Sequence, residues 1–318
     1  MNQPLMTHAT ETIEAGSKSF ATASKLFDSQ TRRSALMLYA WCRHCDDVID
    51  GQALGFMAPV TTSDQHFPAP APVTTPEVRL QELRQQTALA FEGAPMTEPA
   101  FAAFQEVALA QEIPARLAFD HLEGYAMDVR EEIYLNFDDT LRYCYHVAGV
   151  VGLMMAQVMG VRDEAVLDRA CDLGLAFQLT NIARDIVEDA HVGRCYVPLA
   201  WLAAENLTLE NYVDPSQRSA LARVAQRLIE EAEPYYHSAQ AGLHGLPLRS
   251  AWAIATARGV YREIGVKVRH AGKDAWQQRQ GTSKAEKIRL LIAGAGQAVA
   301  SRGAKASPRP AHLWQRPR

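Results

Sequence analysis

Apolar side chains recur three and four residues apart through most of this 318-residue chain, the spacing that lines them up on one side of an α-helix. Nine segments show the pattern: residues 34–50, 77–91, 98–111, 115–130, 138–159, 163–189, 216–241, 248–271 and 283–300. No convincing run of alternating apolar and polar residues, the pattern of a half-buried strand, interrupts them. The sequence therefore predicts an all-α fold, and its length alone allows one large domain or two ordinary ones.

Composition and charge narrow the class of protein. The chain is 48% hydrophobic with a net charge of -4, which suits a large buried core and does not suit a nucleic-acid binder, whose surface is usually strongly basic. The longest apolar run, residues 147–161, is shorter than the ~20 residues of a membrane span. Residues 1–17 lack the apolar stretch of a secretory signal, and the five cysteines are expected to be reduced. We therefore expect a cytoplasmic protein that does not cross a membrane.

Two segments lack the helical pattern. Residues 51–76 contain five prolines and predict a loop, which is either a flap over a site or a tolerated insertion. Residues 301–318 are predicted to form a disordered, proline-containing tail, and seven Lys or Arg and no acidic residue follow Glu286. Such a tail either contacts anionic lipid at the inner face of a membrane or is simply solvated.

The first acidic motif runs from Tyr39 to Asp50. On a helix, Tyr39, Arg43, Asp46 and Asp50 share one face because they are spaced by three, four and seven residues. Neighbouring carboxylates repel one another and are costly to bury. Mg²⁺ relieves that cost, since it prefers carboxylate oxygens and keeps water and substrate phosphates in its coordination shell.

A second acidic motif occupies residues 178–189. Gln178, Asn181, Asp185 and Asp189 stand at relative positions 0, 3, 7 and 11, so they also share one helical face. Apolar residues between them fall on the opposite, core-facing side. A buried helix would thus present a row of oxygen ligands.

If the two rows of oxygen ligands face each other across a helical bundle, they could hold Mg²⁺ ions that bind a diphosphate. Arg43, Arg184 and Arg194 accompany them and could neutralise the remaining phosphate charge. The alternative is a pair of ion-paired polar seams between helices, without a ligand.

A stripe of small residues, Ala148, Gly152 and Ala156, lies on the predicted helix 138–159. It either lets another helix approach closely or leaves room for a long apolar ligand, and nearby methionines add an adaptable apolar surface. Residues 42–45, Cys-Arg-His-Cys, lack the second ligand pair of a zinc site. Gly294 and Gly296 lack the third glycine of a dinucleotide-binding loop, so no nicotinamide cofactor is expected.

Together these segments resemble the squalene/phytoene synthase family, from Gly16 to the region around Arg279. The most specific matches are Leu173-Gly174-x3-Gln178-x2-Asn181-x2-Arg184-Asp185-x3-Asp189-x4-Arg194-x-Tyr196-x-Pro198 and Tyr143-Cys144-x2-Val147-Ala148-Gly149-x2-Gly152. Bacterial phytoene synthases look most similar, including the ending Pro310-Ala-His-Leu-Trp-Gln-Arg-Pro. The resemblance implies a single-domain, isoprenoid-synthase-type helical bundle over residues 1–300, around a central apolar channel.

The resemblance also implies roles for individual residues. It implies magnesium ligands, with Mn²⁺ as an alternative ion, at Asp46, Asp50, Asp185 and Asp189, supported by Asn181. It implies diphosphate contacts at Ser17, Ser19, Arg43 and Arg279, and aromatic rings near a carbocation at Tyr39, Tyr143 and Tyr261. It implies channel-lining residues at Val147, Ala148, Gly152, Gln178 and Leu179. The acidic positions show no departure from the family pattern.

The implied activity is a prenyl transfer in carotenoid biosynthesis. Two geranylgeranyl diphosphates would be joined head to head through a cyclopropyl diphosphate to give phytoene and diphosphate. Three alternatives remain: a squalene or dehydrosqualene synthase acting on C15 substrates, a chain-elongating prenyltransferase or terpene cyclase, and a non-catalytic assembly protein on the same fold. Asn181 before Arg184 and Asp185 argues against the second, and the intact acidic pairs argue against the third.

Overall fold

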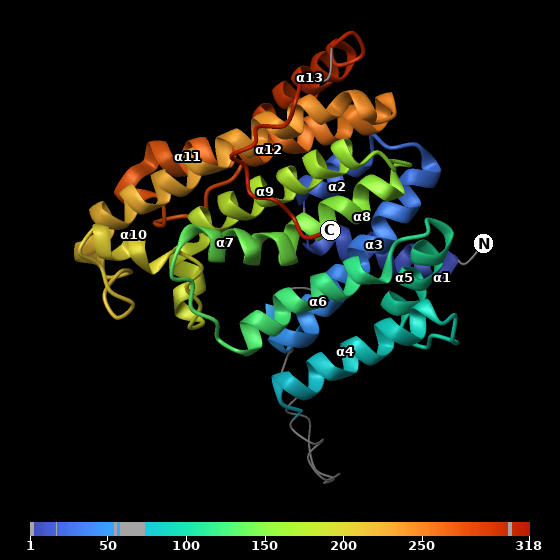
Figure 1. Ribbon diagram of the computed structural model, residues 1–318, viewed down its shortest axis with the longest axis horizontal. Helices are drawn as coiled ribbons and strands as arrows, with labels where there is room; N and C mark the ends of the chain where they lie inside the picture. Colours follow the sequence, from blue (N-terminus) through green and yellow to red (C-terminus); the bar gives the residue numbers. More distant parts are fainter. Residues whose placement is uncertain (1–2, 17, 54–55, 58–73, 305–306) are drawn as a thin grey trace.

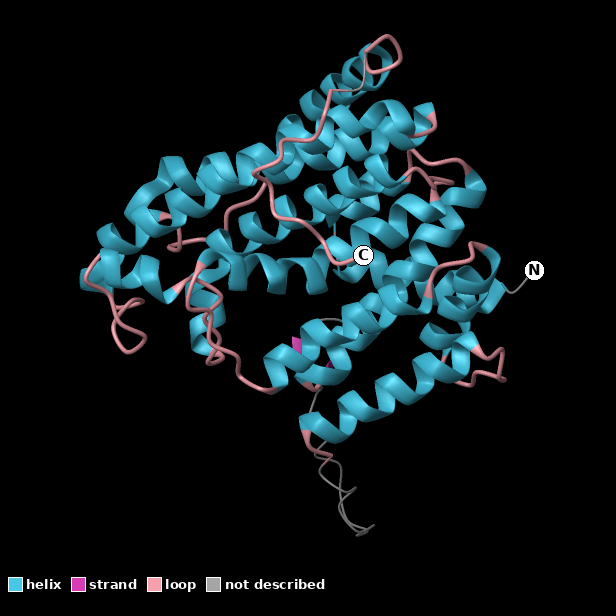
Figure 2. Ribbon diagram, viewed as in Figure 1, coloured by secondary structure: helices cyan, strands magenta, loops and turns pink. Residues whose placement is uncertain are grey.

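The computed structural model describes residues 3–16, 18–53, 56–57, 74–304 and 307–318, which form a bundle of helices (Figures 1 and 2). The helices are α1 (Gln3–Gly16), α2 (Lys18–Ser24), α3 (Ser29–Asp50), α4 (Pro76–Phe91), α5 (Pro99–Ala110), α6 (Ala115–Val129), α7 (Phe137–Cys144), α8 (Val150–Val158), α9 (Glu164–His191), α10 (Leu199–Ala204), α11 (Arg218–Gly242), α12 (Leu248–Ala271) and α13 (Lys284–Ala300). Short 3-10 turns are η2 (Pro215–Gln217), η3 (Leu243–Gly245) and η4 (Gly272–Asp274). The predicted all-α class is confirmed.

The segment after α3 carries two two-residue strands, β1 (Gln52–Ala53) and β2 (Phe56–Met57), which pair antiparallel. Sequence periodicity predicts only a loop there, because strands this short leave no alternating pattern. Residues 54–55 and 58–73 of the predicted loop lie outside the described residues.

The predicted helix 138–159 is interrupted. Between α7 and α8 the chain forms one π-helical turn, η1 (Tyr145–Gly149), and such turns are frequent at functional sites. The extra residue in this turn changes which side chains face inward, and both Val147 and Ala148 reach the wall of the central cavity. A single inserted residue does not disturb the apolar spacing enough to be visible in the sequence.

α9 is the central helix of the bundle. It packs against α8, η1, α11 and α12, and Figure 1 shows it between the α11–α12 layer and the helices near the N-terminus. Its first turn is capped by Asp163, whose carboxylate accepts a hydrogen bond from the backbone N–H of Val166 at 3.1 Å. α3 packs against α1, α4, α5 and α6, with Trp41 stacked on Phe104 at a ring-centroid distance of 4.0 Å. The two acidic motifs therefore lie on separate helices of one core.

Glycines allow α8 and η1 to approach α9 closely. A Cβ at Gly174 would lie 2.3 Å from the carbonyl oxygen of Ala148, and one at Gly152 would lie 2.4 Å from that of Ala170. Real Cβ atoms do not approach backbone oxygens so closely. The stripe of small residues therefore serves helix packing, and the same residues also line the cavity.

The C-terminal segment, residues 307–318, packs along α9, contrary to the prediction of a disordered tail. Figure 1 shows it running back across the bundle. Leu313 is buried, Arg309 pairs with Asp172 at 2.7 Å, and Arg316 pairs with Asp168 at 2.7 Å. These arginines meet carboxylates far away in the sequence, so the tail's own composition does not reveal the pairing. Because its arginines are engaged within the protein, the tail gives less support to lipid contact than its charge suggests.

Candidate active site

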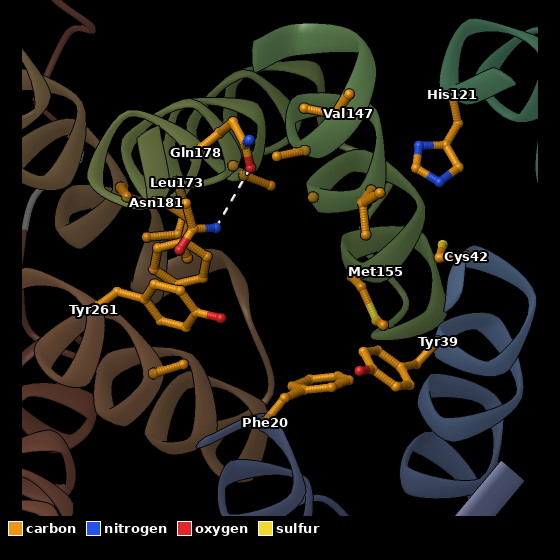
Figure 3. Close-up of a pocket in the computed structure, with 18 of the residues that line it drawn as sticks. Phe20, Tyr39, Cys42, His121, Val147, Met155, Leu173, Gln178, Asn181 and Tyr261 are labelled. Atoms are coloured by element: carbon orange, nitrogen blue, oxygen red, sulfur yellow. Dashed lines mark hydrogen bonds between the residues drawn. The ribbon is translucent and has the colours of Figure 1, made fainter. Parts of the chain in front are cut away.

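A cavity of about 590 Å³ lies at the centre of the bundle. Side chains from α2, α3, α6, α7, η1, α8, α9, α11 and α12, and from the segment that follows α9, line it. Figure 3 shows Tyr39, Val147, Met155 and Tyr261 around the open space. Apolar side chains and small residues form most of the wall, whereas the carboxylates gather in one region with Arg43, Arg184 and Arg194. The cavity thus has a polar region and an apolar body.

Both acidic motifs reach this cavity. Asp46 lines it from α3, and Asp185 and Asp189 line it from α9. Asp50 is outside the lining itself, but its Oδ1 lies 2.7 Å from Nη2 of Arg194, which does line the cavity. The prediction that the two acidic helices face one another thus agrees with the geometry.

Burial raises the pKa of several carboxyl groups here. The pKa of Asp46 rises to about 6 through burial, although the nearby Arg43 guanidinium acts in the opposite direction. Burial and the neighbouring Asp185 raise the pKa of Asp189 to about 7. A group with a raised pKa is held in an environment that disfavours its negative charge. Added positive charge would therefore stabilise the ionised site.

Arginines already contact these carboxylates. Arg43 Nη1 lies 3.0 Å from Asp46 Oδ2, and its Nη2 lies 2.7 Å from Asp47 Oδ1. Asp185 accepts hydrogen bonds from Arg184 Nε at 2.7 Å and from Arg279 Nη2 at 2.9 Å. Arg279, which lies mainly in solvent, thus contacts the site through Asp185 and also pairs with the exposed Glu188 at 3.8 Å. Guanidinium groups are well suited to phosphate oxygens.

The donor set fits Mg²⁺ ions that also bind a phosphate ligand. Within the described ranges, no three His, Cys, Asp or Glu side chains converge into a metal cage of their own. Mg²⁺ does not need one, because it is usually held by one or two carboxylates together with waters and phosphates. Among the described residues, the buried Oδ1 of Asn181 has no hydrogen-bond partner, as expected for an oxygen that serves as a ligand. Asn181 Nδ2 donates to Gln178 Oε1 at 3.4 Å (Figure 3).

Aromatic rings stand beside the carboxylates. Tyr39 lies 5.5 Å from Phe20, and Tyr261 stacks on Phe177 at 4.1 Å, both between ring centroids. All four rings line the cavity. Tyr143 also lines it, so the three predicted tyrosines are brought to one space. Their faces could stabilise positive charge on a bound ligand.

Most predicted channel residues lie where they were expected, with one correction. Val147, Ala148, Gly152 and Gln178 line the cavity. Leu179 does not: it is 0% exposed and packs in the core, because it follows Gln178 by one residue and so lies ~100° further around the helix. Ser17 lies outside the described residues, and the side chain of Ser19, on α2, is likewise not described.

Asp128 on α6 is a site residue that sequence reasoning missed. Its carboxylate accepts hydrogen bonds from the hydroxyls of Tyr143 at 3.3 Å and Tyr196 at 3.0 Å, and all three residues line the cavity. Burial, partly opposed by Arg194, raises its pKa to about 6. Only its helical spacing from Tyr125, another lining residue, could have drawn attention to it.

Comparisons with a family model and with curated proteins agree on one family. The family model described as "Squalene/phytoene synthase" matches residues 13–287. A 15-cis-phytoene synthase of Pantoea ananas is 67% identical over 318 residues, covering 100% of both chains. A phytoene synthase of Pseudescherichia vulneris is 63% identical over 314 residues, covering 99% of this chain and 98% of the relative.

Solved structures share the fold. A dehydrosqualene synthase in complex with a ligand superposes with a TM-score of 0.79 at 24% identity, covering 94% of this chain and 98% of that one. A squalene synthase from Alicyclobacillus acidocaldarius superposes with a TM-score of 0.69 at 21% identity, covering 86% of this chain and 97% of that one. At these identities, the likeness concerns the arrangement of the helices.

Proposed function

The chain belongs to the squalene/phytoene synthase family, and from this membership and the form of its cavity we propose that it catalyses phytoene synthesis from two molecules of geranylgeranyl diphosphate. The relatives that are 63–67% identical over nearly their whole length are phytoene synthases. The observation that carries the proposal is the meeting of two acidic helices at one region of an otherwise apolar cavity. Such a cavity suits a ligand with a long hydrocarbon chain and a diphosphate group.

The proposed reaction has two ionisations. The C1–O bond of the first substrate breaks, diphosphate leaves, and the 2,3-double bond of the second substrate attacks the allylic cation. Loss of a proton closes a cyclopropane ring. The second C–O bond then breaks, the cation rearranges, and loss of another proton gives phytoene. Two diphosphates and two protons are released and no reductant is consumed, which agrees with the expectation that no nicotinamide is needed.

The arginines and carboxylates would bind the leaving group. Arg43, Arg184 and Arg194 line the cavity and would exchange part of their contacts with carboxylates for contacts with phosphate oxygens. Asp46, Asp185, Asp189, Asn181 and Asp50 would hold the Mg²⁺ ions. When bound, those ions supply positive charge that stabilises the departing diphosphate.

The rest of the cavity would protect the cation. Tyr39, Tyr143 and Tyr261 would direct their ring faces towards positive charge, and the apolar wall would exclude water that could quench it. No side chain is assigned as the final base, because departing diphosphate can also accept the proton. Since the product is a hydrocarbon, the proposal includes release at the cytoplasmic face of a membrane, where the product would partition.

Product analysis tests this function. The purified chain would be incubated with Mg²⁺ and either C15 or C20 diphosphate, with and without NADPH, and the hydrocarbons identified by mass. We expect C40 phytoene from the C20 substrate without NADPH. A preference for the C15 substrate would instead indicate dehydrosqualene or squalene synthesis, and the absence of any condensed hydrocarbon would refute the proposal.

A further inference from the structure

The cavity wall contains a charged side chain far from the carboxylates of the two acidic motifs. Arg169, near the start of α9, lines the cavity together with Val166. Arg169 and Asp185 are 16 residues apart on one helix (185 − 169), which is ~24 Å at 1.5 Å per residue. Arg169 therefore stands at the opposite end from the diphosphate-binding region.

Arg169 is held in place rather than free to move. It is 5% exposed, its Nη1 donates to the carbonyl oxygen of Ser238 at 3.0 Å, and its Nη2 donates to the carbonyl oxygen of Ser307 in the C-terminal segment. Its stem passes against Gly242, where an added Cβ would lie 2.9 Å from Arg169 Cβ. Contacts on α11 and on the C-terminal segment thus fix this side chain from two sides.

The C-terminal segment is itself anchored beside Arg169. Arg309 donates to both carboxylate oxygens of Asp172, at 2.7 and 2.8 Å, and Asp172 is 0% exposed. The hydroxyl of Ser238 donates to the same carboxylate at 2.5 Å. Because a buried carboxylate without its partner is strongly destabilising, this ion pair keeps the segment closed over the start of α9.

We propose that Arg169, held by Ser238 and by the C-terminal segment, forms the floor of the cavity and sets the longest prenyl chain that the enzyme accepts. This inference rests on the proposed function, which places prenyl chains in the cavity. A chain with one more isoprene unit must displace Arg169 and deprive a buried guanidinium of hydrogen bonds, which is costly. The specificity comes from a polar network at the floor, whereas apolar residues along the wall provide the general affinity.

The test measures chain-length preference in the full-length protein. Rates with Mg²⁺ and either C20 or C25 diphosphate would be compared for the wild type and for Arg169→Ala. We expect the wild type to prefer the C20 substrate, and we expect Arg169→Ala to raise the C25-to-C20 ratio of kcat/KM at least tenfold, a range typical of added methylene groups in a pocket. Arg169→Gln, which keeps a donor for Ser238, should change the ratio in the same direction.

Arg258→Ala is the matched control. Arg258 is also a buried arginine that donates to a carbonyl, that of Tyr236 at 2.7 Å, but it does not line the cavity. Its removal should leave the ratio unchanged. The inference is overturned if the wild type uses C25 as well as C20, if folded Arg169 variants keep the wild-type ratio, or if Arg258→Ala raises the ratio equally. Failure of the wild type to condense C20 at all would refute the proposed function instead.

Discussion

Nη2 of Arg194 lies 2.7 Å from Oδ1 of Asp50, although 144 residues separate them in the sequence. The contact links the end of α3 to the segment that follows α9. The positive charge of Arg194 also lowers the pKa of Asp46, Asp128 and Asp189 against the effect of their burial. One guanidinium therefore interacts with carboxylates from α3, α6 and α9, so the two acidic motifs form a single electrostatic unit.

Asp185 should be essential for turnover. Asp185→Asn removes a charge that lines the cavity and the carboxylate that both Arg184 and Arg279 contact. We expect kcat to fall by about 100-fold or more, as on loss of a group that stabilises transition-state charge. Steady-state kinetics with the C20 substrate measures it. Glu188→Gln is the control, because Glu188 is exposed and outside the cavity, and it should keep nearly normal activity. A near-normal rate for Asp185→Asn would contradict the proposed role.

Asp189 should make the metal-free protein less stable as pH rises. Its pKa is about 7 in the folded state against 3.8 for an ordinary solvated aspartate, so the folded state binds more protons between these values. Stability then falls as pH rises from about 4 to about 7. Asp189→Asn removes this dependence, so its stability relative to wild type should increase between pH 5 and pH 8 by on the order of 1 kcal/mol. Urea unfolding in EDTA measures the difference, and an equal difference at both pH values would contradict the raised pKa.

Tyr143 should act through its ring rather than its hydroxyl. Its ring stacks on Tyr196 at 4.3 Å, and its hydroxyl donates to Asp128 at 3.3 Å. Tyr143→Phe keeps the ring face and should keep kcat within about fivefold, whereas Tyr143→Leu should lose roughly 30-fold, the equivalent of about 2 kcal/mol for a desolvated cation–π contact. Single-turnover rates with the C20 substrate would distinguish the two variants. If Phe loses as much as Leu, the hydrogen bond to Asp128 is the important feature.

Gly174 should not tolerate a methyl group. A Cβ there would overlap the carbonyl oxygen of Ala148 at 2.3 Å, so Gly174→Ala should lower the free energy of unfolding by about 1–3 kcal/mol through overpacking. Gly296 is the control, because no described atom lies within 4 Å of an added Cβ in α13. Gly296→Ala should be neutral or stabilising by up to ~1 kcal/mol, from helix propensity alone. Equal effects of the two substitutions in denaturant titrations would contradict the close approach of η1 and α9.

Local patterns in the sequence predicted the helices and the shared face of each acidic motif, because both depend on the spacing of nearby residues. Helix α12 begins at Leu248 and ends at Ala271, as the periodicity indicates, and both acidic motifs reach the cavity because helical geometry places residues four apart on one face. Asp128 was missed, since its hydrogen-bond partners Tyr143 and Tyr196 are 15 and 68 residues away. The ordered tail depends on ion pairs that span 137 residues or more. Features created by tertiary contacts leave little trace in local composition.

Binding of an unreactive substrate analogue tests the central claim most directly. Calorimetry would measure the affinity of geranylgeranyl thiodiphosphate with Mg²⁺ and with EDTA, for the wild type and for a protein carrying Asp46→Asn and Asp185→Asn. If carboxylates on α3 and α9 bind the diphosphate through metal ions, the wild type should bind at least 100-fold more weakly in EDTA, a loss of about 2.7 kcal/mol. The double variant should bind weakly in both conditions. Equal affinity of the wild type with Mg²⁺ and with EDTA, unchanged in the variant, would contradict the account.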